Sequence, residues 1–222
     1  MYSKTTLIDD YRHKGLRKKL LQELRSKGIT SDTVLTAFDK VPRHFFLDKA
    51  FEELAYQDRP VPIGYRQTIS QPYTVALQSQ LLNVQKRQKI LEIGTGSGFQ
   101  ACILEEMGAR VYTIERQEGL YRKTMSKLEQ IGYSHIKCFL NDGFKGLPYH
   151  APFDKIIVTA TPGELPYDLI DQLVIGGVMV LPKGNHKNQK MMLLTKTSHN
   201  TYTLEEKVSA YFVPMLEGIE QL

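Results

Sequence analysis

The stretch at residues 89–101, KILEIGTGSGFQA, decides how the rest of the chain is interpreted. An apolar run ends in Gly94, Gly96 and Gly98, and a helical pattern follows. Glycines let the backbone turn sharply and approach a ligand without an intervening Cβ atom. A strand that passes through such a turn into a helix is typical of an open α/β sheet, in which ligands lie over the carboxyl ends of the strands.

Downstream of this turn, short β-rich runs alternate with helical patterns. We expect strands at residues 89–93, 110–115, 136–140, 155–159 and 178–181, and helices at about 98–107, 120–131 and 166–175. Such alternation requires parallel crossovers and a doubly wound, Rossmann-like sheet. Two later runs, KMMLLTKT and TYTLEEKVSAYFVPM, are predicted to close the sheet as an antiparallel strand pair.

The first 60 residues predict a helical extension instead. Apolar residues recur at helical spacing over residues 16–27 and again from Ser31 or Asp32 to Val41, and a third short helix is expected after Asp48.

The segment PVPIGYRQ follows, at residues 60–67, and predicts an irregular connector or a short hairpin because it holds two prolines and a glycine. A helix is expected at about residues 72–83, with Ser70 as its cap and Pro72 in its first turn. We therefore predict a single domain over residues 1–222, with the extension at 1–60 and the core at 61–222.

Composition narrows the class of protein. Of the 222 residues, 41% are hydrophobic and 24% are charged, as in folded globular proteins. The net charge is +5, but the basic residues are scattered among acids, so no nucleic-acid partner is expected. The first residues, MYSKTTLIDDYR, lack the apolar run of a signal peptide, and no window is apolar enough to span a membrane, so we expect a cytoplasmic protein.

No metal site is expected from the cysteines and histidines. Cys102 and Cys138 lie far apart without a nearby histidine at ligand spacing, and we interpret them as inert buried thiols. The histidines also lack ligand spacing and are expected on the surface: His13, His44, His135, His150, His186 and His199.

Carboxylates at the ends of the next two strands indicate a nucleoside cofactor. Glu115 follows Gly94 by 21 residues, the position from which a carboxylate accepts hydrogen bonds from ribose hydroxyls. Asp142 could hold an adenine amino group, although a turn residue is an equal interpretation, and Gly143 would leave room for the ring.

Two features favour S-adenosylmethionine over NAD. The glycines are spaced Gly-x-Gly-x-Gly rather than Gly-x-Gly-x-x-Gly, and Glu92 would repel a pyrophosphate but tolerate a cationic methionyl group. The predicted cofactor-binding residues are Ser70, Glu92, Gly94, Thr95, Gly96, Gly98, Glu115, Asn141, Asp142 and Gly143.

The segment after the fourth strand, VTATPGELP, lacks the Asn or Asp followed by two prolines and an aromatic residue that is expected in methyltransferases acting on the amino group of a base. At this point the chain resembles protein-L-isoaspartate O-methyltransferases. VPRHFF, PIGYRQTISQPY, LEIGTGSGFQ, APFDKIIVTATP, GGVMVLPKG and FVPM occur in the family's order, and the resemblance extends from about Leu16 onward.

The resemblance implies a class I methyltransferase fold, with damaged proteins and peptides as the substrates. The methyl group would pass from S-adenosylmethionine to the free α-carboxylate of L-isoaspartyl residues, and the ester would close to a succinimide and so begin repair. The serine of TIS matches Ser70, which is then the catalytic residue. Residues implied to bind the acceptor are Thr68, Ile69, Gln71, Val75 and Val213. The resemblance also implies a monomer.

This chemistry needs no general base. An α-carboxylate has a pKa of about 3.5 and is already ionised at pH 7, so alignment and exclusion of water are the main tasks. The Ser70 hydroxyl can hydrogen-bond the carboxylate without adding charge.

The sequence departs from the family pattern at Arg66, where a second glycine is usual, and at Asn141 before Asp142. Two alternatives stay open: a methyltransferase of the same fold that acts on RNA or a small molecule, and a non-catalytic relative that binds the cofactor but lost activity through Arg66.

Overall fold

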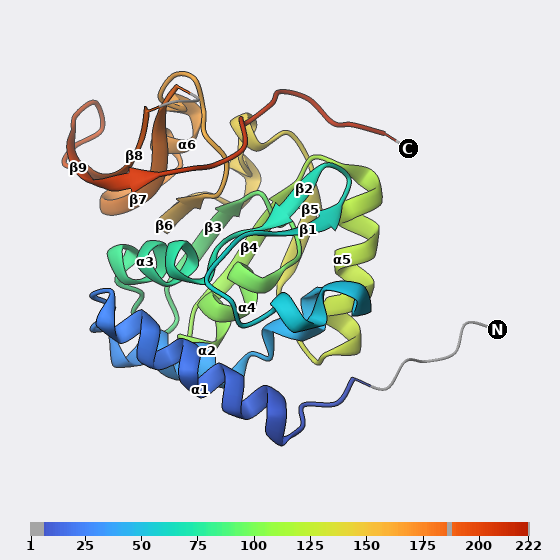
Figure 1. Cartoon of the computed structure of the whole chain (residues 1–222). Helices are drawn as coiled ribbons and strands as arrows, with labels where there is room; N and C mark the ends of the chain where they lie inside the picture. The colour runs from blue at the N-terminus through green and yellow to red at the C-terminus, as the bar shows by residue number, and fades with distance from the viewer. Residues whose placement is uncertain (1–6, 186–187, 222) are drawn as a thin grey trace.

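The computed structural model describes residues 7–185 and 188–221 and is built on a seven-stranded sheet (Figure 1). The strand order is β5-β4-β3-β6-β7-β8-β9. The first five of these pair in parallel and the last two antiparallel, which confirms the predicted doubly wound sheet with a closing antiparallel pair. The strands are β3 (Lys89–Ile93), β4 (Arg110–Glu115), β5 (Lys137–Leu140), β6 (Phe153–Val158), β7 (Leu173–Asn185), β8 (Asn188–Lys196) and β9 (Tyr202–Ala210).

Strand order reverses between β3 and β6, which fixes where a ligand can bind. The chain runs from β3 outward through β4 to β5 and then returns to β6 on the other side of β3. The loops after β3 and β6 therefore diverge and leave a crevice at the carboxyl ends of these strands. β3 is buried on both faces: Ile90 packs into one hydrophobic core and Leu91 into the other.

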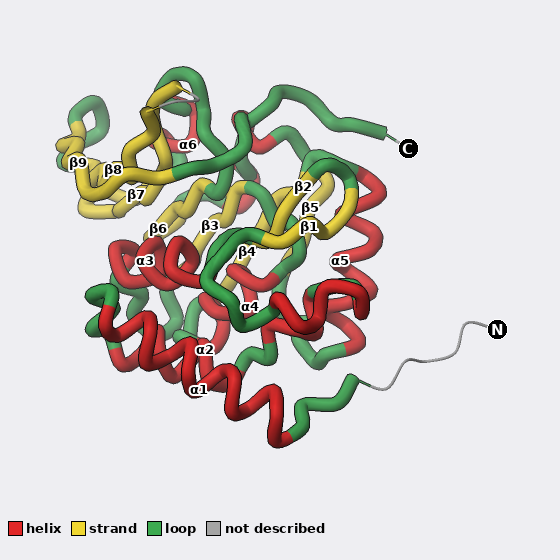
Figure 2. Tube along the Cα trace, in the orientation of Figure 1, coloured by secondary structure: helices red, strands yellow, loops and turns green. Residues whose placement is uncertain are grey.

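Helices cover both faces unequally, and those of the N-terminal part gather on one face (Figure 2). Leu24, Phe38 and Leu82 share one core with Ile90, whereas Leu169 and Ile170 lie in the opposite core. The helices are α1 (Tyr11–Ser26), α2 (Asp32–Lys40), α3 (Pro72–Leu82), α4 (Phe99–Glu106), α5 (Glu118–Gln130) and α6 (Tyr167–Asp171), and the 3₁₀ turns are η1 (Arg43–Phe46), η2 (Lys49–Leu54), η3 (Gly143–Lys145) and η4 (Pro148–His150).

Two element starts differ most from the predicted ones. α1 begins at Tyr11, five residues before the apolar pattern of residues 16–27, because the Asp10 carboxylate accepts a hydrogen bond from the His13 amide and caps an earlier turn. β7 begins at Leu173, within the helix predicted to reach residue 175, and Leu173 pairs with Phe153.

The buried Lys196 ammonium explains this early end of α6. Its Nζ atom donates to the carbonyl oxygens of Ile170, Asp171 and Leu173, at 2.9, 3.1 and 3.0 Å. These carbonyls therefore have partners without a further helical turn.

The segment at residues 60–67 forms a hairpin of β1 (Val61–Gly64) and β2 (Gln67–Ile69). Its turn residues Tyr65 and Arg66 have φ angles of 52° and 56°, a left-handed conformation that favours glycine or asparagine. The Tyr65 ring packs against Gly119, where a Cβ atom would lie 2.4 Å from the ring. This contact anchors the hairpin on the first turn of α5.

Two histidines expected on the surface are buried. His13 and His44 are each 7% exposed, and their rings stack with centroids 3.8 Å apart. Each ring has a polar partner: His13 Nε2 lies 2.7 Å from a carboxylate oxygen of the partly buried Glu52, and His44 Nδ1 lies 2.8 Å from the Tyr56 hydroxyl. The surface prediction was wrong for both, and His186 lies outside the described residues.

Asp9 joins these histidines in a group whose ligand atoms lie within 4.8 Å of one another. Both Asp9 oxygens, however, accept hydrogen bonds from the Arg17 guanidinium at 2.9 Å, and that charge opposes a cation. The prediction that the protein holds no metal stays a prediction. Within residues 7–185 and 188–221, no helix is both long and apolar enough to cross a membrane.

Candidate active site

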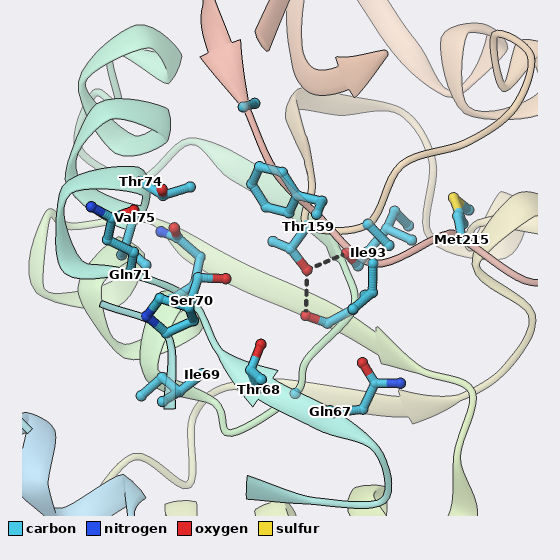
Figure 3. Close-up of a pocket in the computed structure, with 18 of the residues that line it drawn as sticks. Gln67, Thr68, Ile69, Ser70, Gln71, Thr74, Val75, Ile93, Thr159 and Met215 are labelled. Atoms are coloured by element: carbon cyan, nitrogen blue, oxygen red, sulfur yellow. Dashed lines mark hydrogen bonds between the residues drawn. The ribbon is translucent and has the colours of Figure 1, made fainter. Parts of the chain in front are cut away.

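A cavity of about 890 Å³ opens at the carboxyl ends of β3, β4 and β6. Its walls come from three parts of the chain: the loops after these strands, the segment from β2 into α3, and residues 208–216 after and within β9 (Figure 3). The volume is that of a site for a nucleoside cofactor together with an acceptor side chain.

The glycine turn after β3 is held by β4 on one side and by Thr159, directly after β6, on the other. The Gly94 and Thr95 amides both donate to the Ile114 carbonyl oxygen at 2.9 Å. The Thr159 hydroxyl lies 2.9 Å from the carbonyl oxygens of Ile93 and Gly94 (Figure 3). A Cβ atom at Gly94 would lie 2.5 Å from that hydroxyl oxygen, so only glycine fits here.

Glu115 stands at the edge of the cavity, as predicted for a group that binds ribose. Backbone amides of Gly96, Arg116 and Gln117 donate to its carboxylate at 2.9, 2.9 and 3.0 Å. Burial nevertheless raises the pKa of Glu115 above the usual value. The carboxylate is thus fixed in orientation and keeps lone pairs with which to accept from a diol.

Of the residues after β5, Gly143 lines the cavity, whereas Asn141 and Asp142 stabilise the turn behind it. Gly143 lines the cavity, and a Cβ atom there would lie 2.6 Å from Ile93 Cγ2, so this wall has no room for a side chain. Asp142 lies behind it and accepts hydrogen bonds from the Phe144 and Gly218 amides, each at 2.9 Å. The Asn141 side chain accepts from the Asp142 amide and donates to the Gly146 carbonyl, so it shapes this turn.

Two other predicted cofactor residues also lie off the cavity wall. Glu92 is fully buried, accepts a hydrogen bond from the Thr113 hydroxyl at 2.5 Å, and has its pKa raised to about 8 by desolvation. Gly98 has a φ of 85°, and a Cβ atom there would lie 3.0 Å from Thr124 and 3.1 Å from Leu128. Gly98 therefore lets α5 pack closely on the glycine turn.

All the predicted acceptor residues line the cavity: Thr68, Ile69, Ser70, Gln71, Val75 and Val213. Figure 3 shows those from the segment before and within α3 on one side and Ile93 and Met215 on the other. Among the described residues, the Ser70 hydroxyl has no hydrogen-bond partner, and it is free to bind a ligand.

Ser70 does not cap α3, contrary to the prediction. The N-cap residue is Gln71, and the Tyr73 amide donates instead to the Asp58 carboxylate at 2.7 Å. Asp58 also accepts from the Gln71 side chain and from Lys27 Nζ, at 2.9 and 2.5 Å. Pro72 occupies the first turn, as predicted.

The C-terminal segment, residues 211–220, closes one side of the cavity. Thr161 exchanges backbone hydrogen bonds of 2.8 Å with Val213 and Met215. Further along, the Glu220 carboxylate lies 2.8 Å from Arg116 Nη1. Arg116 is the residue that follows Glu115, the last residue of β4. The family resemblance implied Val213 here. Sequence reasoning missed the ion pair between Arg116 and Glu220, and it missed the Thr159 hydroxyl, whose only signal was its place at the end of the fourth predicted strand.

The cavity fits S-adenosylmethionine. Gly94 and Gly143 leave room for the cofactor because they have no side chains, the Glu115 carboxylate is fixed in orientation, and the adjoining walls are apolar. Together with the sheet order, this defines the class I methyltransferases, and S-adenosylmethionine is the cofactor.

The profile of the family described as "Protein-L-isoaspartate(D-aspartate) O-methyltransferase" matches residues 15–220, and the chain belongs to this family. Two curated relatives carry the name protein-L-isoaspartate O-methyltransferase. The one from Christiangramia forsetii is 49% identical and the alignment covers 94% of this chain and 98% of the relative. The one from Cytophaga hutchinsonii is 50% identical with 94% of each chain covered.

Solved structures agree with this assignment. A protein-L-isoaspartate O-methyltransferase superposes with a TM-score of 0.83 at 27% identity, over 92% of this chain and 67% of that one. A Plasmodium falciparum protein assigned to the same enzyme class, solved with S-adenosyl-L-homocysteine, gives 0.79 at 25% identity, over 90% of this chain and 98% of that one.

Proposed function

We propose that this cavity transfers a methyl group from S-adenosylmethionine to the free α-carboxylate of L-isoaspartyl residues in damaged proteins and peptides. The ester then closes spontaneously to a succinimide, whose hydrolysis returns some normal aspartate. The observation that carries the proposal is the acceptor segment, residues 67–75, which forms a wall of the same cavity as the glycine turn and Glu115.

The lining of the cavity suits an acceptor that is already ionised. Among its described residues, Glu115 is the one carboxylate, and there is no histidine, lysine or cysteine. A substrate hydroxyl or amine would need a group to remove its proton, whereas a carboxylate of pKa about 3.5 does not. This favours a carboxylate over RNA or a typical small-molecule acceptor.

Each wall has a separate task. The bound cofactor supplies a methyl group on a positively charged sulfur. Glu115 and the turn at Gly94 and Gly96 hold the nucleoside, while the Ser70 hydroxyl donates a hydrogen bond to one oxygen of the acceptor carboxylate and so orients the other. Ile69 and Val75 keep water out of this end, which strengthens the attraction between the carboxylate and the sulfonium.

Labelled methyl transfer tests the proposal. The assay uses an isoaspartyl peptide beside the same peptide with normal aspartate, scored as base-labile methanol. We expect label on the isoaspartyl peptide alone, and Ser70→Ala should lower kcat/KM by roughly 10- to 100-fold with unchanged stability. Label on neither peptide would contradict the proposed reaction. Full turnover by a stable Ser70→Ala protein would contradict the role of Ser70.

The proposal includes a single-domain, monomeric enzyme of the cytoplasm that acts on proteins and peptides without a nucleic-acid partner. Size-exclusion chromatography with light scattering tests the monomer. RNA that binds at low salt and inhibits methyl transfer would contradict the expectation that the protein has no nucleic-acid partner.

A further inference from the structure

Arg43 is a buried charge for which the mechanism above has no role. It begins η1 in the segment VPRHFF, and its side chain is 1% exposed. Burial lowers the pKa of its guanidinium to about 9. In the described part of the chain, its Nε and Nη1 atoms have no hydrogen-bond partner. Such unpaired buried donors are uncommon and call for an explanation.

The remaining contacts of Arg43 reach two walls of the cavity from behind. Nη2 donates to the Ser70 carbonyl oxygen at 2.7 Å. The guanidinium also lies 4.9 Å from the ring centroid of Phe99, the first residue of α4. Ser70 and Phe99 line the cavity, whereas Arg43 does not. Arg43 thus touches the acceptor segment without being open to a ligand.

The hydrogen bond to Ser70 also fixes the next amide. In a trans peptide, the carbonyl of one residue and the N–H of the next point in opposite directions. With the Ser70 carbonyl directed at Arg43, the Gln71 N–H is directed away from it. That amide has no backbone partner among the described residues, and Gln71 lines the cavity. Within residues 7–185 and 188–221, the Ser70 hydroxyl and the Gln71 amide are therefore two adjacent donors without protein acceptors.

Asp58 holds the residues that follow this peptide. It accepts from the Gln71 side chain and the Tyr73 amide, at 2.9 and 2.7 Å. Arg43 therefore fixes the carbonyl of the Ser70–Gln71 peptide, and Asp58 fixes the Gln71 side chain and the start of α3 that follow it. A cation that bonds to a carbonyl also polarises the peptide and strengthens its N–H as a donor.

We propose that Arg43 is a positioning residue for methyl transfer: it holds the Ser70–Gln71 peptide so that the Ser70 hydroxyl and the Gln71 amide both donate to the acceptor carboxylate. The inference rests on the proposed function, since it assumes that a carboxylate binds at Ser70. It explains why a charge is buried here with one hydrogen bond, although a neutral side chain of similar size would serve stability equally well or better.

The test replaces Arg43 with methionine, which keeps the length and removes the charge and the donors. The matched control is Arg17→Met. Arg17 is 6% exposed, lies in the same N-terminal part and hydrogen-bonds Asp9 and Tyr56, but does not contact Ser70. Both variants and the wild type are assayed well below their melting temperatures for KM and kcat with the isoaspartyl peptide and, by calorimetry, for S-adenosylhomocysteine affinity.

For Arg43→Met we expect kcat/KM for the peptide to fall roughly 10- to 100-fold, as for a misplaced donor, with cofactor affinity within about twofold of the wild type. Arg17→Met should melt at a lower temperature yet keep kcat/KM within about threefold. Arg43→Lys, which keeps the charge, should lie between the wild type and Arg43→Met.

The inference is overturned if Arg43→Met keeps kcat/KM, or if it loses cofactor affinity and peptide turnover in parallel. Should Arg43→Met fail to fold, Arg43→Lys decides: an unchanged peptide KM and kcat would contradict the positioning role. A wild type that methylates no isoaspartyl peptide would instead contradict the proposed function, so the two failures differ.

Discussion

Arg66→Gly is expected to stabilise the protein, because Arg66 occupies a left-handed backbone conformation with φ 56° in the β1–β2 turn. This conformation costs a residue with a Cβ atom about 1–2 kcal/mol, and glycine removes that strain. The larger conformational entropy of glycine in the unfolded state opposes this by about 0.5–1 kcal/mol. The net gain is therefore about 0.5–1 kcal/mol in the free energy of unfolding, or roughly 1–4 °C in melting temperature for a chain of this size.

The control is Arg66→Ala, which removes the charge and keeps the strained backbone. Arg66 is exposed and interacts with Glu220 only through solvent-screened attraction, so the charge itself should matter little. Urea unfolding of the three proteins at equal ionic strength gives the comparison. A glycine variant that is no more stable than the alanine variant would refute the strain argument. Peptide turnover by the wild type already tests whether Arg66 has inactivated the site.

Three further predictions concern Glu115, Glu92 and Gly143. Glu115→Gln should weaken S-adenosylhomocysteine binding roughly 10- to 100-fold by calorimetry, because three backbone amides and the ribose lose a charged acceptor; unchanged affinity would contradict the ribose assignment. Glu92 has a folded-state pKa of about 8, above its usual value of 4.5, so the folded protein binds a proton more tightly and loses stability as the pH rises from about 4.5 through 8. Glu92→Gln should flatten this profile in urea melts, and an equally steep profile would contradict it. Gly143→Ala places a Cβ atom 2.6 Å from Ile93 and 3.1 Å from Met215, so it should cost about 1–3 kcal/mol in unfolding free energy and weaken cofactor binding; a neutral result would mean that the wall can move.

The central strands were predictable because their signal is local. β3 and β4 match the predicted ranges 89–93 and 110–115, since short apolar runs that end in a glycine turn or a carboxylate need no distant partner to be recognised. The start of β7 was not predictable. Leu173 continues a helical pattern in the sequence, and only its pairing with Phe153 and the ammonium of Lys196 make it a strand.

The site divides in the same way. Gly94, Glu115 and Gly143 are recognisable from their spacing after strands, and they line the cavity. Asp58 displaces Ser70 from the capping role, and Arg43 reaches Ser70 across 27 residues of sequence. The sequence near Ser70 does not predict the contact of Asp58 with the Tyr73 amide or that of Arg43 with the Ser70 carbonyl, because both depend on how the N-terminal helices pack on α3 and α4.

The clamp between Arg116 and Glu220 has a consequence for synthesis on the ribosome. The glycine turn, Glu115 and the acceptor segment all leave the exit tunnel well before residues 211–220, yet the cavity lacks a wall until those residues pair with Thr161 and Arg116. A nascent or prematurely terminated chain can therefore fold most of its sheet while it still has no closed compartment for methyl transfer. Methyl transfer can therefore begin only after residues 211–220 have been made and have paired with Thr161 and Arg116.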